Sequence, residues 1–433
     1  MPLKIKLPGQ PFAYVTEHSQ EVDPETAFVL TAQNEKYLSD ATARDPHSVI
    51  KASELAPLFG LDRIKIIGIT GTNGKTTTAS AIYSFLLDLG YKAAMQGTRG
   101  FFMNDEVVEG KSLTTPSVLN TYRHIYQAVA AGCDYFVMEV SSHAIVQERI
   151  EGIPFELKIL TNITQDHLDY HKNLEEYIRV KNSFFSDEGK KLINKDEEKA
   201  EFNIKNTMTY GVENPATYKI MAYSLNEGIS GIMQHFGEMI PFTASLHGFF
   251  NLYNLAAAIG AVHMVTGRKL EEICDVVDQF AGVSGRMEVV SEEPVVIVDF
   301  AHTPDGMQQV LNALKEKEVV VVFGAGGDRD RTKRPLMGKV AASFAKKIYV
   351  TSDNPRYEDP DAIIDDILRG IEGHDRVVVD PNRKAAIRRA LDEREGDEVV
   401  LILGKGDETY QQIYDERLPF DDREVVREFL QRT

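Results

Sequence analysis

A phosphate-binding segment is the strongest chemical signal in this sequence: it reads GITGTNGKTTTAS over residues 68–80, between an apolar run and a helical pattern. Backbone N–H groups at the start of a helix attract phosphate oxygens. Gly71 and Gly74 permit close approach of a backbone, Lys75 can reach β- and γ-phosphates, and Thr76 can ligate Mg²⁺. Ile69 occupies the place of the usual first glycine, so the segment is a shortened P-loop. We predict a nucleotide site rather than a purely structural turn.

Polar residues follow two further apolar runs. Glu139 ends one run within MEVSSHA, where a metal-binding carboxylate is expected beside a P-loop. The next run leads into TNITQDHLDYH, residues 161–171, which gathers five polar side chains: Asn162, Asp166, His167, Asp169 and His171. The two histidines could indicate zinc, but the oxygen-rich, cysteine-free setting favours Mg²⁺. Each residue alone would more often be a cap or a surface group, whereas together they predict a metal or substrate site.

Two cations have unremarkable local explanations. Lys181 lies among apolar residues of EEYIRVKNSFF, where a lysine usually buries its stem and keeps its charge in water. Arg356 lies in TSDNPRYEDP, residues 351–360, after another apolar run. Asp, Asn and Pro predict a turn there, and on local evidence Arg356 is a solvated loop charge.

The composition restricts the function classes. With 433 residues the chain should form two to four domains, and 43% hydrophobic and 26% charged residues fit a soluble globular protein. The formal charge of −18 argues against a nucleic-acid or anionic-membrane surface. Cys133 and Cys274 are too few and too far apart for a disulfide framework, which indicates a reducing compartment. We find no signal segment and no apolar stretch long enough for a membrane span, and we expect a cytoplasmic protein.

The pattern of elements predicts an α/β protein. IKIIGIT, DYFVMEV and LKILTNI are continuous apolar strands between helices, which is typical of a parallel sheet covered on both faces. We expect helices at about 76–89, 175–185, 251–267 and 270–280. A small antiparallel patch is expected from about residue 190, in TMTYGV, ATYKIMAYSL and GIMQHF.

A second series of strands and helices begins near Pro294 and predicts a separate, Rossmann-like C-terminal domain. The first 60 or so residues are weakly patterned, with a turn at ARDPHS. We therefore divide the chain into a small N-terminal α/β domain (1–62), a central P-loop ATPase domain (63–283) and the C-terminal domain (284–433).

These motifs occur in an order that resembles the Mur ligases of peptidoglycan synthesis, most closely their tripeptide-synthetase branch. The matching stretches are GTNGKTT, MEVSSHAIVQERI, TNITQDHLDYH, HGFFNLYNLAAA, GRME, DFAHTPDG, FGAGGDRDRTKRPLMG and GKGDETYQ. The resemblance covers nearly all of residues 63–433. It implies three domains that hold a UDP-sugar, ATP and an incoming amino acid. It also implies an ADP-forming ligase, in which a substrate carboxylate becomes an acyl phosphate that an amine then attacks.

The resemblance assigns roles to the residues of the nucleotide and metal sites. Lys75, Lys181 and His167 would be catalytic, with Lys181 carbamylated by CO₂. Two Mg²⁺ ions would be held by Thr76, Glu139, His167 and the Lys181 carbamate. ATP would contact Gly71, Thr72, Asn73, Gly74, Lys75, Thr76, Thr77, Asn251, Asn254, Arg286, Asp299 and His302.

The resemblance also assigns the two acceptor sites. UDP-MurNAc-L-Ala-D-Glu would contact Ser19, Thr114, Thr115, Ser141, Gln147 and Arg149. The sequence DNPR is the form found where the added amino acid is meso-diaminopimelate, whose second carboxylate suits the guanidinium fork of Arg356. That pocket would comprise Arg329, Asp353, Asn354, Pro355, Arg356, Gly404 and Glu408. The family usually has His where this chain has Asp407, which changes the charge beside the pocket.

Other readings remain open. The same ligase could add L-lysine. A folylpolyglutamate-type ligase shares the P-loop and fold plan, although DNPR and the paired LTTPS and SSHAIVQER motifs argue against it. A P-loop ATPase that only switches conformation would need no amino-acid pocket. We expect a monomer whose partners are small-molecule substrates.

Overall fold

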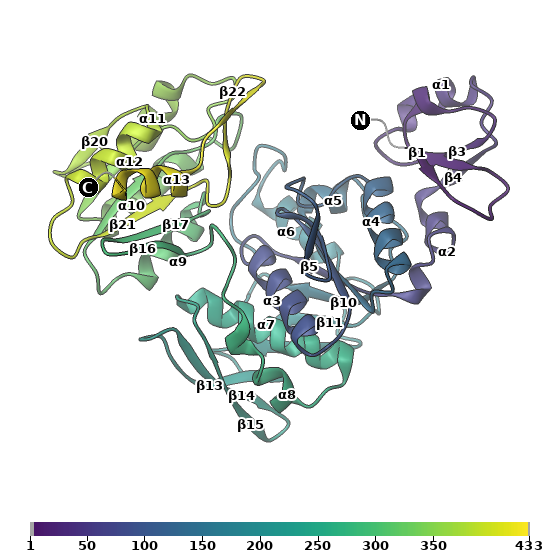
Figure 1. The fold of residues 1–433 in the computed structure, drawn as a ribbon, viewed down its shortest axis with the longest axis horizontal. Coiled ribbons are helices and arrows are strands. Elements are labelled where there is room, and N and C mark those ends of the chain that lie inside the picture. Colours follow the sequence, from purple (N-terminus) through teal and green to yellow (C-terminus); the bar gives the residue numbers. More distant parts are fainter. Residues whose placement is uncertain (1–3, 432–433) are drawn as a thin grey trace.

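The computed structural model describes residues 4–431, in which three sheets follow one another along the chain and a two-stranded hairpin lies near its end (Figure 1). The N-terminal and C-terminal units flank the central one (Figure 1). Mixed α/β architecture is therefore confirmed. Cys133 and Cys274 are buried free thiols, as expected.

The N-terminal unit is a sheet in the order β1-β2-β3-β4, with β2, β3 and β4 parallel. The bounds are β1 Lys4–Lys6, β2 Tyr14–Thr16, β3 Thr26–Leu30, α1 Leu38–Thr42, β4 Ser48–Lys51 and α2 Leu55–Leu58. The predicted ARDPHS turn joins α1 to β4 and holds Asp45 at a positive φ of 54°. β3 is buried along most of its length, so it is the core strand of this unit.

The central unit is an 11-stranded sheet in the order β15-β14-β13-β12-β11-β10-β5-β9-β6-β7-β8. Its strands are β5 Lys65–Thr70, β6 Ala93–Gly97, β7 Gly100–Met103, β8 Glu106–Glu109, β9 Tyr135–Glu139, β10 Phe155–Leu160, β11 Lys191–Asn194, β12 Thr207–Gly211, β13 Tyr218–Ser224, β14 Ile229–His235 and β15 Glu238–Ala244. The pairs from β13 to β6 are parallel, and antiparallel strands extend both edges. The antiparallel patch is thus confirmed for β13–β15. β12 instead belongs to the parallel part, because alternation reports one-sided burial and not strand direction.

Helices cover both faces of this sheet, as continuous apolar strands require. α3 Lys75–Asp88 and α7 Phe249–Thr266 pack together in one core cluster, and α4 Val118–Ala130 and α6 Leu174–Ser183 contribute to another. α5 Ser142–Val146 and α8 Leu270–Cys274 are short helices. The helix expected to continue to residue 280 is therefore wrong in length. A 3₁₀ turn, Val277–Gln279, follows and lets Val277 and Phe280 enter the core.

α7 is the one helix in the described part of the chain that is long and apolar enough to cross a membrane by length and composition. The sequence predicted a helix at 251–267 and no apolar stretch long enough for a membrane span. Because 67% of the segment is buried against α3 and the sheet, α7 has the packing of a core helix.

The C-terminal unit is a sheet in the order β16-β17-β21-β18-β19-β20, parallel except for the β16 edge. Its strands are β16 Glu288–Glu292, β17 Val295–Asp299, β18 Val319–Phe323, β19 Lys347–Val350, β20 Val377–Val379 and β21 Val399–Leu403. Its helices are α9 Pro304–Ala313, α10 Lys333–Phe344 and α11 Pro360–Leu368 on one core cluster, and α12 Arg383–Asp392 and α13 Asp422–Leu430 on the other. The hairpin comprises β22 Tyr410–Ile413 and β23 Glu416–Pro419. Loops from the carboxyl ends of β17, β18, β19 and β21 meet at one edge, where ligands bind in such sheets.

Candidate active site

The P-loop joins β5 to α3 and is closely packed from behind. A Cβ on Gly71 would lie 1.8 Å from Thr161 Oγ1, and one on Gly74, where φ is +84°, would lie 2.4 Å from Asn254 Oδ1. Asn254 is itself held by Asn251, whose Oδ1 accepts a bond of 2.9 Å from Asn254 Nδ2. Glycine is therefore required at both loop positions. The structure places Asn251 and Asn254 as a support beneath the loop.

Two lysines converge on this loop. Lys75 Nζ donates to the carbonyl oxygens of Gly71 and Thr72 over 2.7 and 2.8 Å, and Lys181 Nζ, from α6, donates to the same Gly71 oxygen over 2.8 Å. Burial lowers the pKa of Lys75, although Glu139 and Asp166 oppose the shift. Burial and the neighbouring charge of Lys75 lower the pKa of Lys181 well below its ordinary value. Lys181 is therefore a buried amine beside the P-loop and not a snorkelling surface charge.

Glu139 lies beside Thr76, as expected for a shared metal site. Its Oε2 accepts from Thr76 Oγ1 at 3.1 Å, and its Oε1 accepts from the backbone N–H of Thr98 at 3.0 Å. Within residues 4–431 no group of three or more His, Cys, Asp or Glu side chains is arranged to hold a metal ion. A carboxylate and a hydroxyl fit Mg²⁺, because this ion takes few protein ligands and completes its shell with phosphate oxygens and water.

His167 lies in a neighbouring cluster after β10. Its φ is +53°, its backbone N–H donates to Asp166 Oδ1 at 2.8 Å, and its ring lies edge-on to His143 with 4.9 Å between centroids. Lys333 Nζ, from α10, lies 3.9 Å from Asp166 Oδ1. Burial lowers the pKa of His167, which favours the neutral ring. The structure thus brings Thr76 and Glu139 together and sets His167 with Asp166 and His143.

Five of the residues expected at the UDP-sugar dipeptide form one network. Thr115 Oγ1 donates to the Glu139 carbonyl at 2.9 Å and accepts from Ser141 N at 3.0 Å. Arg149 donates to the Thr115 carbonyl at 2.6 Å and to Gln147 Oε1 at 2.9 Å. Thr114 Oγ1 lies 3.0 Å from the Thr98 hydroxyl. The network therefore adjoins the carboxylate of Glu139.

Ser19 lies in the N-terminal unit, buried in the 3₁₀ turn Ser19–Glu21. Two other residues of that unit reach the central sheet: Gln33 contacts Gln147, and Glu17 accepts from Leu119 N at 3.3 Å. Sequence reasoning missed both residues, because nothing in the weakly patterned N-terminal stretch distinguishes them from ordinary surface groups.

The residues expected across the joint to the C-terminal unit have mainly supporting contacts. Asp299 accepts from the backbone N–H groups of Met287 and Ala301, both at 2.7 Å, and burial raises its pKa against the opposing charge of Arg286. Arg286 stacks over Phe300 at 4.3 Å.

His302, also expected at the joint, lies with Nδ1 3.0 Å from the Phe300 carbonyl oxygen. Asp305, in the first turn of α9, was missed: its Oδ2 accepts from Asn73 Nδ2 of the P-loop at 2.8 Å. It occurs in the motif DFAHTPDG, which was the available signal.

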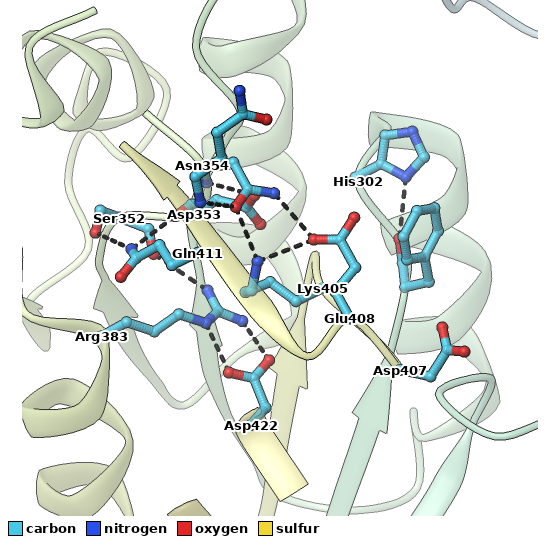
Figure 2. Close-up of polar contacts among 12 residues, drawn as sticks. His302, Ser352, Asp353, Asn354, Arg383, Lys405, Asp407, Glu408, Gln411 and Asp422 are labelled. Carbon is cyan, nitrogen blue, oxygen red and sulfur yellow. Dashed lines mark hydrogen bonds and ion pairs between the residues drawn. The ribbon is translucent and has the colours of Figure 1, made fainter. Parts of the chain in front are cut away.

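At the carboxyl edge of the C-terminal sheet, Asn354, Lys405 and Glu408 form a triangle (Figure 2). Glu408 Oε2 accepts from Asn354 Nδ2 and from Lys405 Nζ, each at 2.9 Å, and Lys405 Nζ also donates to Asn354 Oδ1 at 3.0 Å. Both donors engage the same carboxylate oxygen, so within residues 4–431 they leave Glu408 Oε1 available to a ligand. Lys405 was missed, although it lies in the quoted motif GKGDETYQ.

A buried ion pair supports this triangle from below. Arg383 donates to both carboxylate oxygens of Asp422 at 2.8 and 2.7 Å (Figure 2). It also donates to the Leu403 carbonyl at 2.9 Å. A Cβ on Gly404 would lie 2.6 Å from Asp353 Oδ2, so these two expected residues touch. Neither Arg383 nor Asp422 carried a recognisable sequence signal, because their pairing depends on α12 and α13 packing side by side.

Arg356 is held in a left-handed conformation, φ +52°, by the hairpin. Its N–H donates to Gln412 O at 3.1 Å, and its carbonyl accepts from Tyr414 N at 2.8 Å. The guanidinium donates to Gly327 O at 2.6 Å, and a Cβ on Gly327 would lie 1.9 Å from the Pro355 carbonyl oxygen. Burial and the nearby charge of Arg329 lower the pKa of Arg356. Among residues 4–431, the guanidinium groups of Arg356 and Arg329 form no ion pair with a carboxylate.

The chain matches two family models, described as the Mur ligase middle domain over residues 69–262 and the Mur ligase, glutamate ligase domain over residues 285–406. It is 55% identical to the UDP-N-acetylmuramoyl-L-alanyl-D-glutamate--2,6-diaminopimelate ligase of Wolinella succinogenes, covering 95% of each chain. It is 48% identical to the protein of that name from Helicobacter pylori, over 99% of this chain and 98% of the relative.

Solved structures give the same picture of the fold. A structure of a ligase of that name matches 100% of this chain and 97% of its own, with 30% identity and a TM-score of 0.68. A Mycobacterium tuberculosis folylpolyglutamate synthase matches 82% of this chain and 91% of its own with a TM-score of 0.66, but at 18% identity it shows a shared fold alone.

Proposed function

Since the chain belongs to the Mur ligase family, we propose that it is the ATP-dependent, ADP-forming ligase that adds meso-diaminopimelate to UDP-MurNAc-L-Ala-D-Glu in peptidoglycan precursor synthesis. The observation that supports this amino acid most strongly is the pair Arg356 and Arg329. Their neighbouring guanidinium groups have no carboxylate partner within the described chain, and they lie close to Glu408. The relatives' names support the same substrate.

The chemistry of the added amino acid fits this pocket. The distal centre of meso-diaminopimelate carries both an ammonium group and a carboxylate. Arg356 can receive the carboxylate in a bidentate fashion, and the free Oε1 of Glu408 can receive an ammonium group. Lysine lacks the distal carboxylate and would leave the half-buried Arg356 guanidinium without a carboxylate partner, which costs a factor on the order of 10⁴ in discrimination.

ATP and Mg²⁺ are the cofactors of this family, and the residues present fit them. Residues 71–77 would surround the phosphates, and Thr76 and Glu139 would hold Mg²⁺, which offsets the charge of the transferring phosphoryl group. Lys75 would be directed at the phosphates from within the loop. We also propose a second Mg²⁺ near His167. The nucleotide would be contacted from the C-terminal side by Arg286, Asp299 and His302.

Lys181 would act as a carbamate. CO₂ reacts with a neutral amine, and burial beside Lys75 favours that form. The product is an anion that can pair with Lys75 and orient Mg²⁺, whereas a second ammonium group could do neither.

The remaining residues of the chain mainly position the substrates. Thr114, Thr115, Ser141, Gln147 and Arg149 would hold the UDP-sugar dipeptide beside Glu139, with Ser19 at its uridine end. The substrate carboxylate would form an acyl phosphate, and the amine bound near Glu408 would displace phosphate. Such a reaction needs alignment more than covalent protein chemistry. We expect a monomer that acts in the cytoplasm, where its nucleotide-linked substrates are found.

The test supplies ATP, Mg²⁺ and UDP-MurNAc-L-Ala-D-Glu and compares phosphate release with meso-diaminopimelate and with L-lysine. Turnover that depends on the dipeptide substrate and strongly favours diaminopimelate is expected. Equal or better turnover with lysine overturns the amino-acid assignment. A rate of ATP hydrolysis that is the same with and without the acceptor substrates would instead indicate an ATPase that only switches conformation.

A further inference from the structure

One ion pair joins the central and C-terminal units beside the amino-acid pocket. Lys111 lies in the loop between β8 and α4, and Asp407 lies in the loop after β21. Lys111 Nζ is 3.2 Å from Asp407 Oδ1 and also donates to the Asp407 backbone carbonyl. Lys111 therefore contacts both the side chain and the backbone of Asp407. The two contacts together restrict the orientation of Asp407 as well as its distance from Lys111.

The pair links the two acceptor sites through short stretches of chain. Lys111 precedes Thr114 by three residues, and Asp407 directly precedes Glu408. In Figure 2 Asp407 lies apart from the Asn354–Lys405–Glu408 triangle, and no dashed line joins it to these three residues. The contact with Lys111 directs Asp407 toward the central unit.

The turn that carries Asp407 also packs against the segment connecting the two units. A Cβ on Gly285, where φ is +71°, would lie 2.1 Å from Asp407 N and 2.5 Å from the carbonyl carbon of Gly406. Ser284 is tied to α13 through Arg423. Because Gly285 and Asp407 are in close contact, a change of backbone conformation at residues 284–286 would shift Asp407 relative to Lys111.

The charges facing Lys111 favour the contact. Asp407 and Glu408 attract it, Arg423 opposes it, and burial lowers the pKa of Lys111. The side chains are 32% and 18% exposed, so water screens the pair less than a fully exposed one.

We propose that Lys111 and Asp407 are a positioning pair that holds the two units closed and couples binding of the UDP-sugar dipeptide to binding of the amino acid. The inference rests on the proposed function. It adds a coupling between the Thr114–Thr115 loop and Glu408. Lys111 and Asp407 provide this coupling without contacting a substrate themselves.

The experiment is a double-mutant cycle in the full chain with Lys111→Met, Asp407→Asn and both together, measuring kcat and the KM of each substrate. Each single change should raise the KM of the dipeptide and of the amino acid about three- to tenfold, and the double variant should resemble either single one. The KM of ATP should change less than twofold. Asp407→Glu should restore most of the loss, since it keeps the charge.

A second readout reports closure itself. Glu227→Cys in the central unit and Glu372→Cys in the C-terminal unit are exposed labelling positions, while both natural cysteines are buried. With ATP and UDP-MurNAc-L-Ala-D-Glu, energy transfer between dyes should indicate a smaller closed fraction in Asp407→Asn. Lys190→Ala, which removes an ion pair with Glu156 inside the central unit, is the control.

Additive effects in the cycle, unchanged KM values or unchanged energy transfer would each overturn the proposal. Failure of the amino-acid assignment is distinguishable, because it appears in the unmodified protein as a preference for lysine. In that case the cycle is measured with lysine and still tests the pair.

Discussion

Lys75 and Lys181 donate to the same carbonyl oxygen, that of Gly71, over 2.7 and 2.8 Å. Two buried ammonium groups around one oxygen repel each other, and the structure lowers both pKa values, that of Lys181 well below the ordinary range. The arrangement favours a neutral Lys181 that can be converted to an anion.

Lys181→Ala should reduce kcat at least about 100-fold, because the anion that pairs with Lys75 and orients Mg²⁺ is lost. Bicarbonate or acetate should partly restore activity by occupying the vacated space. Lys191→Ala is the matched control. Lys191 is equally buried, lies at the start of β11 and also donates to backbone carbonyls, those of Gly189 and Lys205. A fully active Lys181→Ala would contradict the role.

Arg356→Ala and Arg356→Lys should raise the KM of diaminopimelate at least about 100-fold and leave that of ATP nearly unchanged, because both remove the bidentate contact to the second carboxylate. Steady-state kinetics with each substrate varied in turn provides the measurement. Arg388→Ala, which loses a partly exposed ion pair with Glu428 in the same unit, serves as the control. A KM change limited to ATP would argue against the pocket.

Arg383→Met should destabilise the protein by about 3–5 kcal/mol, because it leaves the Asp422 carboxylate buried without its partner. The double change Arg383→Met with Asp422→Leu should recover much of this loss, since an apolar pair carries no unpaired charge. Urea unfolding monitored within the C-terminal unit measures both. Equal destabilisation in the single and double variants would contradict the explanation.

Asp196 should make the central unit sensitive to acid. Its carboxylate accepts from the backbone N–H groups of Val212, Glu213 and Asn214 at 2.7, 2.9 and 2.7 Å. Burial would raise its pKa, but these donors outweigh burial and lower the pKa from 3.8 to about 2. The stabilisation is therefore complete above about pH 4 and is lost as the pH falls through about 2.

Asp196→Asn should accordingly lower the free energy of unfolding at pH 7 by about 1 kcal/mol, a value reduced for solvent screening at this partly exposed site. The difference from the unmodified protein should shrink below pH 4. Thermal melts across pH 2–7 follow it, with Glu198→Gln at a nearby exposed position for comparison. A difference independent of pH would mean that the carboxylate charge is not responsible.

Local sequence determined much of this protein. The apolar runs at β5, β9 and β10 predicted parallel strands, because burial on both faces demands continuous hydrophobic residues. The P-loop composition predicted a nucleotide site, because only glycine fits where Thr161 and Asn254 approach the backbone. The turn predicted in TSDNPRYEDP lies at its second half, where Glu358 N donates to the Pro355 carbonyl at 3.1 Å.

Tertiary structure decided what depends on contacts between distant segments. The antiparallel β6–β7–β8 edge of the central sheet, the Arg383–Asp422 pair and the bond between Asn73 and Asp305 join residues whose spacing in the sequence carries no periodic signal. Lys181 illustrates the difference: its residue type and helical position indicated an ordinary lysine, whereas packing beneath Gly71 removes its water and places it beside a second ammonium group. Desolvation and the charge of a neighbour arise only when the chain has folded, and they give this lysine its chemistry.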